Sequence, residues 1–449
     1  MPVPAESPPG PVPGTSPGPV PGPVPGALAG ACGEVRAATP ADSVAGVMPS
    51  YVAWPASVAE ASAVMRAAAG LGLAVLPRGT GTRLAWGAAP RRCDLVVDTR
   101  RLDRVLEHEA GDLVARVQAG VTIDKLAGVL GQAGQQLALD LPAAPGGAGR
   151  GTVGGVLATG VAGPRRLRYG TPRDLGIGIT VVLADGTVAH SGGKVVKNVA
   201  GYDLGKLFAG SYGTLGLIVE LAFRLHPVPA AAAFVSCDCP DAAAAQDVVA
   251  AAAGSPLAPV AAEIDRPARG APLRVAVLVE GDPDGVAERA ALLRSLLGDG
   301  ASVSDLPPPW WGRSGLAAAD ATLIRIAFWA GELAAVLDAV DAAASAAGLD
   351  PQVGGSAAAG VLYAAVPPGA EPAAVAELVA ALRAAGPLAA AGDDGPPSRG
   401  SAVVLHAPAA VRGAVDVWGP VPSAGLMRAV KEQFDPGYRM APGRFAGGI

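Results

Sequence analysis

The sequence has few of the residues that build metal sites and nucleic-acid surfaces. Four histidines are scattered along the 449 residues, with no i, i+4 pair among His108, His190, His226 and His406. Aromatic residues make up 4% of the chain, its net charge is −5, and no part of it forms a basic domain. We therefore predict no metal site, and nucleic-acid binding is disfavoured because it needs a concentrated positive surface.

Cysteine is equally scarce. Only two of the four cysteines (Cys32, Cys93, Cys237 and Cys239) stand close together. Their C-x-C spacing is neither a zinc nor a C-x-x-C redox pattern, and four cysteines so placed cannot assemble an iron–sulfur cluster. The lack of a disulfide framework fits a cytosolic chain. Alternation would place Cys237 and Cys239 on one face of a strand, as two small buried or edge residues.

Other signals are missing as well. No run reaches the roughly 20 apolar residues of a membrane span, and the first Lys or Arg is Arg36, so a basic signal-peptide region is lacking. The sequence predicts a cytoplasmic protein without a transmembrane segment, which could reach the inner face of a membrane only through partners. Neither a Walker A loop nor a G-x-S-x-G motif is present.

Proline and glycine, in contrast, are abundant at the N-terminus. Glycine recurs at every fourth position from Gly10 to Gly30, and prolines fill the intervals. Such a segment can form neither a hydrogen-bonded ladder nor a core. We predict a disordered Pro/Gly-rich tail over residues 1–40.

After the tail, the pattern predicts strands and helices over 41–228 and a repeated unit over 229–410. The repeat is strand–helix–strand–strand–helix–strand, a ferredoxin-like order. Two such units predict one antiparallel sheet with helices on one face. The first unit is expected at 232–238, 241–253, 258–264, 273–280, 283–297 and 301–305, and the second at 321–329, 331–347, 351–354, 360–366, 371–385 and 401–406. A last segment, 411–449, contains a helix and several turns.

Three glycine-rich segments are the strongest functional signals. Residues 77–83 (PRGTGTR) follow a strand and offer closely spaced N–H and hydroxyl donors, which suit a diphosphate or an ordinary turn. Residues 146–155 contain a formal G-x-G-x-x-G, but Pro142 and Pro145 exclude the buried strand that a Rossmann fingerprint requires. Residues 194–219 pass through several glycines into an apolar strand, as expected where a backbone approaches a large ligand.

Two arginine features leave alternatives open. Arg165, Arg166 and Arg168 form a basic cluster that is either solvated surface or a phosphate contact. Arg325 interrupts an otherwise apolar strand, so its side chain either faces solvent by alternation or projects into a cleft as a carboxylate clamp.

Taken together, these motifs resemble the FAD-binding flavoproteins of the vanillyl-alcohol oxidase / p-cresol methylhydroxylase (PCMH) type, most closely the FAD-binding subunits of bacterial glycolate oxidases. The resemblance covers roughly residues 40–449 and is densest over 75–228. It includes the loop at 78–83, Gly151–Gly155, the segments 163–166, 170–174 and 197–204, Gly210–Gly216, Phe434–Pro436 and Pro442–Arg444.

The resemblance implies an α+β fold: a two-subdomain PCMH-type FAD-binding domain (41–228), a ferredoxin-like cap or substrate domain (229–410), and a C-terminal segment (411–449) that returns to the FAD domain. Loop 78–82 would then hold the pyrophosphate, loop 151–155 would line the ribityl and flavin side, and 203–216 would close over the cofactor. The implied FAD-binding residues are Arg78, Gly79, Thr80, Gly81, Thr82, Gly151, Thr152, Val153, Gly154, Gly155, Ala158, Thr159, Arg173, Asp174, Asp203, Gly210, Gly213, Thr214, Gly216 and Ile218.

The sequence also departs from its relatives. Thr82 stands where relatives tether flavin covalently, so we predict non-covalent FAD. The histidine-rich cap site of the sister catalytic subunit is missing, and Met440-Ala441 precede Pro442-Gly443 where relatives commonly have Asn. Arg325 is the only candidate catalytic residue.

The function implied by the resemblance is that of an FAD-bearing subunit in a glycolate oxidase complex. That complex would oxidise a small 2-hydroxy acid, glycolate to glyoxylate, with a catalytic FAD-linked subunit and an iron–sulfur subunit as partners. The alternatives are a stand-alone FAD-dependent oxidase or dehydrogenase and a non-catalytic FAD-binding scaffold.

Overall fold

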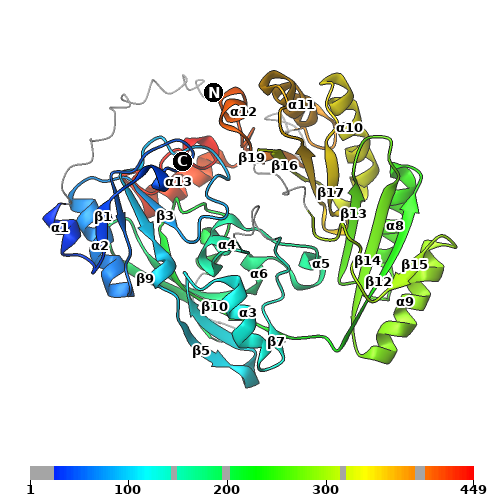
Figure 1. Ribbon diagram of the computed structural model, residues 1–449, viewed down its shortest axis with the longest axis horizontal. Coiled ribbons are helices and arrows are strands. Elements are labelled where there is room, and N and C mark those ends of the chain that lie inside the picture. The colour runs from blue at the N-terminus through cyan, green and yellow to red at the C-terminus, as the bar shows by residue number, and fades with distance from the viewer. Residues whose placement is uncertain (1–24, 143–148, 195–202, 314–319, 390–399) are drawn as a thin grey trace, which may run out of the picture.

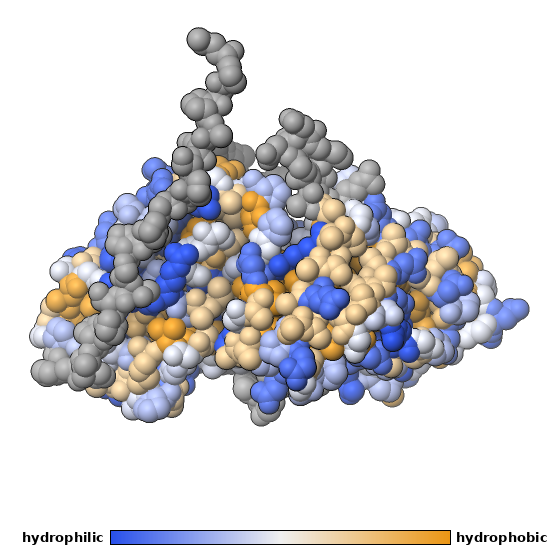
Figure 2. Space-filling model, turned by 90° about the horizontal axis from the view of Figure 1, so that it is seen from above, coloured by the Kyte–Doolittle hydropathy of each residue, from blue (hydrophilic) through white to orange (hydrophobic). Residues whose placement is uncertain are grey.

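The computed structural model describes residues 25–142, 149–194, 203–313, 320–389 and 400–449. Two halves lie side by side, one built from the N-terminal part of the chain together with its C-terminus, the other from the residues between them (Figure 1). Viewed from above, hydrophilic residues are interspersed with apolar ones over both halves (Figure 2). No helix among the described residues is long and apolar enough to span a bilayer.

The first layer of the N-terminal half is a four-stranded sheet in the order β1-β2-β4-β3. Strands β2 and β3 run parallel to β4, and α2 covers them because its apolar side, including Met65, packs on Val75 and Leu95. The Ser57 hydroxyl caps α2 by accepting a hydrogen bond from the Glu60 N–H. The elements are β1 (Val35–Ala37), β2 (Tyr51–Ala53), α2 (Val58–Gly70), β3 (Val75–Arg78) and β4 (Leu95–Asp98).

The second layer is a five-stranded antiparallel sheet in the order β5-β6-β10-β8-β9. Its strands are β5 (Val105–Glu109), β6 (Val114–Gln118), β8 (Gly176–Val182), β9 (Val188–Gly192) and β10 (Leu217–Arg224). The associated helices are α3 (Ile123–Gly131), α4 (Val153–Thr159), α5 (Arg166–Tyr169), α6 (Pro172–Leu175) and α7 (Gly205–Phe208), and a short ladder joins β7 (Gln135–Gln136) to β11 (His226–Pro227).

The other half is one eight-stranded antiparallel sheet, in the order β15-β12-β14-β13-β17-β18-β16-β19. Each set of four strands follows the ferredoxin-like order, and the two sets join where β13 pairs with β17. The first unit is β12 (Ala231–Cys239), α8 (Ala242–Gly254), β13 (Ala261–Arg266), β14 (Leu273–Gly281), α9 (Pro283–Leu297) and β15 (Ser302–Ser304). The second is β16 (Thr322–Ala327), α10 (Leu333–Ala346), β17 (Gln352–Ser356), β18 (Val361–Val366), α11 (Pro372–Ala384) and β19 (Ser401–His406). The predicted α+β fold with a doubled βαββαβ unit is therefore confirmed.

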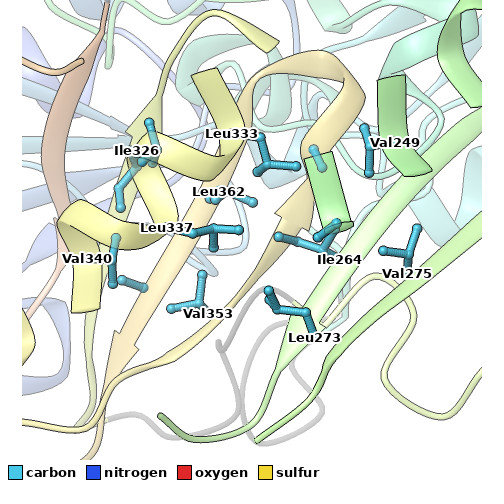
Figure 3. Packing of buried hydrophobic residues seen from close by; sticks show 14 of the residues in the cluster. Val249, Ile264, Leu273, Val275, Ile326, Leu333, Leu337, Val340, Val353 and Leu362 are labelled. Carbon is cyan, nitrogen blue, oxygen red and sulfur yellow. The ribbon is translucent and has the colours of Figure 1, made fainter. Parts of the chain in front are cut away.

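Aliphatic side chains hold these helices to one face of the sheet (Figure 3). Leu333, Leu337 and Val340 of α10 meet Ile326, Val353 and Leu362 of the strands, and all six are completely buried. Because side chains alternate along a strand, the residues between these positions point away from the helices. Leu323, Tyr363 and Val403 accordingly pack against Trp86 and Tyr212 of the N-terminal half, so this sheet works as a cap over the other half.

The C-terminal segment crosses back to the N-terminal half (Figure 1). It contains α12 (Ala409–Ala414) and α13 (Ala424–Phe434). Beyond α13, the backbone pairs with β3: the Val75 N–H donates to the Arg439 carbonyl at 2.7 Å, and the Ala441 N–H donates to the Val75 carbonyl at 2.8 Å. Short 3-10 turns are found at Pro40–Asp42, Thr99–Arg101, Ala110–Asp112, Ala330–Glu332, Ala357–Ala359 and Ala446–Gly448.

One predicted boundary needs correction. The tail was expected to extend to residue 40, but α1 (Gly26–Ala29) and β1 lie within that range. Leu28 is completely buried against the α2 side of the first sheet. An apolar side chain with a partner surface can order a short segment that composition alone classes as disordered. Residues 1–24 lie outside the described part.

Candidate cofactor site

A cleft opens in the N-terminal half where three separate segments converge. Its walls are the loop after β3, the start of α4, and the segment that leads into β10. The lining residues are Pro77, Arg78, Gly79, Thr80, Gly81, Thr82, Arg83, Leu84, Thr99, Ala119, Thr152, Gly154, Gly155, Ala158, Thr159, Tyr212, Gly213, Gly216, Leu217, Ile218 and Arg444.

The loop after β3 presents free backbone donors. Among the described residues, the N–H groups of Gly79, Thr80, Gly81 and Thr82 donate no hydrogen bond within the protein. Gly81 has a φ of +79°, a conformation that glycine adopts without strain. Successive unpaired N–H groups in such a loop form a concave anion site, so this wall suits a diphosphate.

The Arg78 side chain anchors this loop. Its guanidinium donates to Asp98 Oδ2 at 3.0 Å and to Asp42 Oδ1 at 3.2 Å. Burial raises the pKa of Asp42, but the hydrogen bonds from Arg36, Thr39 and Arg78 outweigh it and hold that pKa well below its ordinary value. Arg78 is thus neutralised by carboxylates, and the anion-binding capacity of the loop lies in its backbone.

The second wall is the beginning of α4, packed closely on its neighbours. Thr152 caps the helix by accepting a hydrogen bond from the Gly155 N–H at 3.2 Å. A Cβ on Gly79 would lie 2.3 Å from Thr152 Oγ1, and one on Gly154 would lie 2.8 Å from the Ala119 Cβ. Both positions therefore require glycine, because a side chain would push the first two walls apart.

The third wall is the segment that enters β10. The Tyr212 N–H donates to the Ala158 carbonyl at 2.8 Å, which ties this wall to α4. A Cβ on Gly213, whose φ is +77°, would lie 3.2 Å from Pro77. The Lys431 ammonium group of α13 donates to the Thr214 carbonyl at 2.7 Å and holds the segment from behind.

Uncompensated positive charge gathers at the end of the cleft nearest the cap. Arg83 and Arg444 are 8% and 4% exposed and donate to backbone carbonyls of Pro142, Arg150, Leu84 and Trp86. No ion pair joins either arginine to a carboxylate in the part of the chain described. Burial lowers the pKa of each guanidinium to about 10. Burying an unpaired cation is costly, so this end of the cleft favours an anionic or strongly polar ligand.

Arg325 faces this same region from the cap. It lies half-buried on β16, on the face opposite the helices, and its side chain makes no hydrogen bond or ion pair with the described residues. Its Nε is buried without a partner. Burial raises the pKa of the Tyr212 phenol, and the positive charge of Arg325 opposes that shift, so the two side chains are electrostatic neighbours. Arg325 thus lies at the junction of the two halves, but it is not among the residues that line the cleft, and its role as a carboxylate clamp stays a prediction.

The structure brings most of the residues implied by the resemblance to this cleft, although their contacts with FAD stay a prediction. Those that line it are Arg78, Gly79, Thr80, Gly81, Thr82, Thr152, Gly154, Gly155, Ala158, Thr159, Gly213, Gly216 and Ile218. Gly151 lies directly behind, since a Cβ there would meet Thr82 Oγ1 at 2.9 Å.

Several other predicted site residues have structural roles outside the lining. Asp174 accepts hydrogen bonds from the Thr171 N–H and hydroxyl and so caps α6, beside the exposed Arg173. Asp203 is exposed and pairs with Lys206 at 3.5 Å. Val153 and Thr214 are buried, and Gly210 packs behind the wall against Gly160. Lys197, Asn198, Gly201 and Tyr202 of the motif at 194–204 lie outside the described residues.

In the basic cluster after the second glycine loop, two of the three arginines contact the cap. Arg165 pairs with Glu280 of the cap at 3.2 Å, and Arg166 donates to the Tyr363 hydroxyl oxygen at 3.2 Å. Only Arg168 is exposed. The cluster joins the N-terminal half to the cap, a contact between distant segments that the local sequence could not reveal.

The list of predicted site residues lacks eight that line the cleft: the polar Arg83, Thr99, Tyr212 and Arg444, and the apolar Pro77, Leu84, Ala119 and Leu217. Arg83 and Arg444 belong to motifs that had been singled out, and an arginine within a glycine-containing motif was the available signal. Thr99 and Tyr212 carry no local signature. Among the described residues no cluster of His, Cys, Asp or Glu could hold a metal ion.

Part of this chain is similar in sequence to known proteins. Residues 49–192 match the family model of an FAD binding domain. The chain is 38% identical over 183 residues to glycolate oxidase subunit GlcD of Bacillus subtilis, a match that covers 40% of this chain and 38% of that protein. It is 39% identical over 173 residues to a D-lactate dehydrogenase of Archaeoglobus fulgidus, a match that covers 38% of this chain and 38% of that enzyme. A D-2-hydroxyglutarate dehydrogenase of Xanthomonas citri pv. viticola is 36% identical over 181 residues, 40% of this chain and 38% of that enzyme.

These matches span less than two fifths of the relatives' own lengths. Among solved structures, alkyldihydroxyacetonephosphate synthase superposes with a TM-score of 0.64 at 18% identity, covering 88% of this chain and 76% of that one. That likeness shows the fold alone. The free N–H groups of the first loop and the close-packed glycines fit the diphosphate and the large ring system of FAD. The chain therefore carries an FAD binding domain over residues 49–192, with FAD as its cofactor.

Proposed function

We propose that this chain oxidises a small 2-hydroxy acid with FAD, as the FAD-bearing subunit of a glycolate oxidase-type complex. The observation that carries the proposal is Arg325, a half-buried guanidinium without a protein partner among the described residues. It lies on the cap face that meets the N-terminal half, and its charge acts on Tyr212, which lines the cofactor cleft. An arginine in such a place is suited to a carboxylate, which it can bind through two parallel hydrogen bonds. The names of the relatives, a glycolate oxidase subunit and dehydrogenases of D-lactate and D-2-hydroxyglutarate, support this substrate class.

The roles of the chain's own residues follow from their positions. FAD, when bound, supplies the acceptor for a hydride equivalent. The N–H groups of Gly79–Thr82 would hold its diphosphate, and Gly154, Gly155 and Gly213 would let the cofactor lie against the backbone. Arg325 would orient the substrate carboxylate, while Leu323 and Tyr363 of the cap would keep water from the reacting end.

The partners belong to the same proposal. Electrons would leave through an iron–sulfur subunit, because the four cysteines of this chain are buried and spaced unsuitably for a cluster. A catalytic FAD-linked subunit would be the second partner. The cofactor would be held without a covalent link, since Thr82 offers no histidine or cysteine for a tether.

Anaerobic titration tests the proposal. The purified chain, loaded with FAD, is mixed with glycolate or D-lactate, alone and with the partner subunits, while the flavin absorbance is recorded. Bleaching by a 2-hydroxy acid supports the proposal, and bleaching by the isolated chain identifies a stand-alone dehydrogenase. If neither the chain nor the complex is bleached through this chain's FAD, the protein is a non-catalytic FAD-binding scaffold.

A further inference from the structure

Tyr363 lies on the face of the cap sheet that meets the N-terminal half. It lies on β18 directly opposite Arg325 of β16 in the antiparallel register. Directly opposed residues point to the same face with their Cβ atoms about 5 Å apart. Tyr363 is 8% exposed and contacts the cluster that contains Trp86 and Tyr212. The phenol is therefore a side-by-side neighbour of the free Arg325 guanidinium, on the face that meets the N-terminal half.

Arg166 holds the Tyr363 hydroxyl from the other half. Its Nη2 donates to the phenol oxygen at 3.2 Å, and the same guanidinium donates to the Gly163 carbonyl at 3.2 Å and to the Ala162 carbonyl. Three contacts fix this guanidinium, and none of them is to a carboxylate. The charge-assisted hydrogen bond from Arg166 therefore holds the phenol oxygen in place at the junction between the halves.

The register of the two cap residues suits the two polar groups of the proposed substrate. A 2-hydroxy acid carries its carboxylate and its hydroxyl on adjacent carbon atoms. If Arg325 binds the carboxylate, the hydroxyl lies within reach of a side chain on the neighbouring strand at the same level, which is the position of Tyr363. A general base must approach the proton that it removes to hydrogen-bond distance, and Tyr363 is the side chain that this register provides.

We propose that Tyr363 is a catalytic residue that takes the hydroxyl proton of the 2-hydroxy acid held by Arg325, and that Arg166 is the positioning residue for Tyr363. This inference rests on the proposed function. The substrate O–H bond breaks and its proton passes to the phenolate oxygen. The C2–H bond breaks and its electron pair leaves with the hydrogen to FAD, the oxidant of the proposed reaction. The C2–O bond becomes the carbonyl of a 2-oxo acid.

The histidines are poorly placed for this role. His108 is bonded to Gln135 at 2.9 Å, and His190 to Thr180 at 3.0 Å. His226 packs edge-on against the Tyr169 ring at 4.7 Å. His406 ends the edge strand β19 opposite Leu323, away from the level of Arg325.

Other charged groups surround the phenol. Arg166 donates to it, Arg83 interacts with it across the domain junction, and Arg325 lies beside it. Tyr212 is a second phenol nearby. Glu263 of β13 and Asp140 also interact electrostatically with Arg166.

The experiment uses the FAD-loaded full chain with its partners and single-turnover reduction by D-lactate or glycolate. We expect Tyr363→Phe to lower the limiting rate of flavin reduction by about 100-fold or more. The matched control is Tyr169→Phe, which removes another interfacial phenol hydroxyl, bonded to Glu280 at 3.2 Å; its rate should stay that of the wild type. Arg166→Met should slow reduction, with partial recovery in Arg166→Lys.

A second readout does not depend on turnover. Oxalate, a carboxylate that cannot be oxidised by hydride loss, should perturb the flavin spectrum and bind Tyr363→Phe nearly as well as wild type, but Arg325→Met much more weakly. If wild type is reduced and Tyr363→Phe is reduced as fast as Tyr169→Phe, the assignment of Tyr363 is overturned while the proposed function stands. If no 2-hydroxy acid reduces wild type, both fall.

Discussion

The Lys431 Nζ lies 2.7 Å from Asp435 Oδ2, and neither side chain is exposed to solvent. The same ammonium group donates to the carbonyls of Thr214 and Met440 at 2.7 and 3.0 Å. Asp435 Oδ2 also accepts from the Met440 N–H at 2.7 Å. This pair therefore joins the C-terminal segment to the third wall of the cofactor cleft, although both residues lie far outside residues 49–192.

Removing one partner of this pair should be costly, because the other charge would stay buried and unpaired. We expect Lys431→Met to lower the free energy of unfolding by about 3–5 kcal/mol, measured by urea denaturation of the FAD-free protein. Lys125→Met is the control: its pair with Asp103 spans 2.9 Å between half-exposed side chains, so its loss should cost less than about 1 kcal/mol. Equal effects of the two substitutions would contradict the role given to Lys431.

The junction between the cap and the N-terminal half should make stability depend on pH. Burial raises the pKa of Glu263 to about 8, an effect that Asp140 adds to and that Ser356 and Arg166 oppose. The folded protein then binds more protons than the unfolded chain between about pH 5 and 8, so the free energy of unfolding should fall as pH rises through that window.

The decrease in the free energy of unfolding that one such group causes over this pH range is of the order of a few kcal/mol. Chemical denaturation at pH 5, 6, 7 and 8 measures it, and Glu263→Gln, which stays neutral, should reduce the slope. Burial raises the pKa of Asp140 to about 6. In Glu263→Gln, the pH dependence of the free energy of unfolding that remains below pH 6 should therefore come from Asp140. A slope unchanged by Glu263→Gln would contradict the prediction.

A methyl group on Gly79 should weaken FAD binding. Its Cβ would lie 2.3 Å from Thr152 Oγ1, which forces two cleft walls apart at an overpacking cost of about 1–3 kcal/mol. We expect Gly79→Ala to raise the FAD dissociation constant about tenfold, measured by quenching of flavin fluorescence. Gly128→Ala on α3 is the control, because a Cβ there meets nothing within 4 Å and should leave FAD affinity unchanged.

The FAD should leave the protein on unfolding. Because Thr82 cannot form a flavin bond, acid precipitation of the holoprotein should release all of the FAD into the supernatant, as measured by its absorbance. Yellow colour that stays with the precipitated chain would show a covalent link and refute non-covalent binding.

The cap was predictable because its strands and helices alternate in clear blocks of aliphatic and alanine-rich sequence. The first two cleft walls were predictable because glycine and threonine after a strand have a backbone reason to be there. The contacts of Arg166 with Tyr363 and of Arg165 with Glu280 were not, since each joins residues more than a hundred positions apart and depends on how the halves dock. Asp174 was included because segment 170–174 resembles the family, and the sequence alone did not reveal that its carboxylate caps its own short helix.

In the proposed function, FAD and a carboxylate held by Arg325 lie next to each other at one cleft. The most direct measurement is anaerobic titration of FAD-loaded wild type, Arg325→Met and the surface control Arg269→Met with D-lactate and glycolate, following the flavin absorbance. Wild type and Arg269→Met should be bleached at the same substrate concentration, and Arg325→Met should need about 100-fold more, as expected for a lost charge-assisted carboxylate contact. Bleaching of Arg325→Met at the wild-type concentration would contradict the claim.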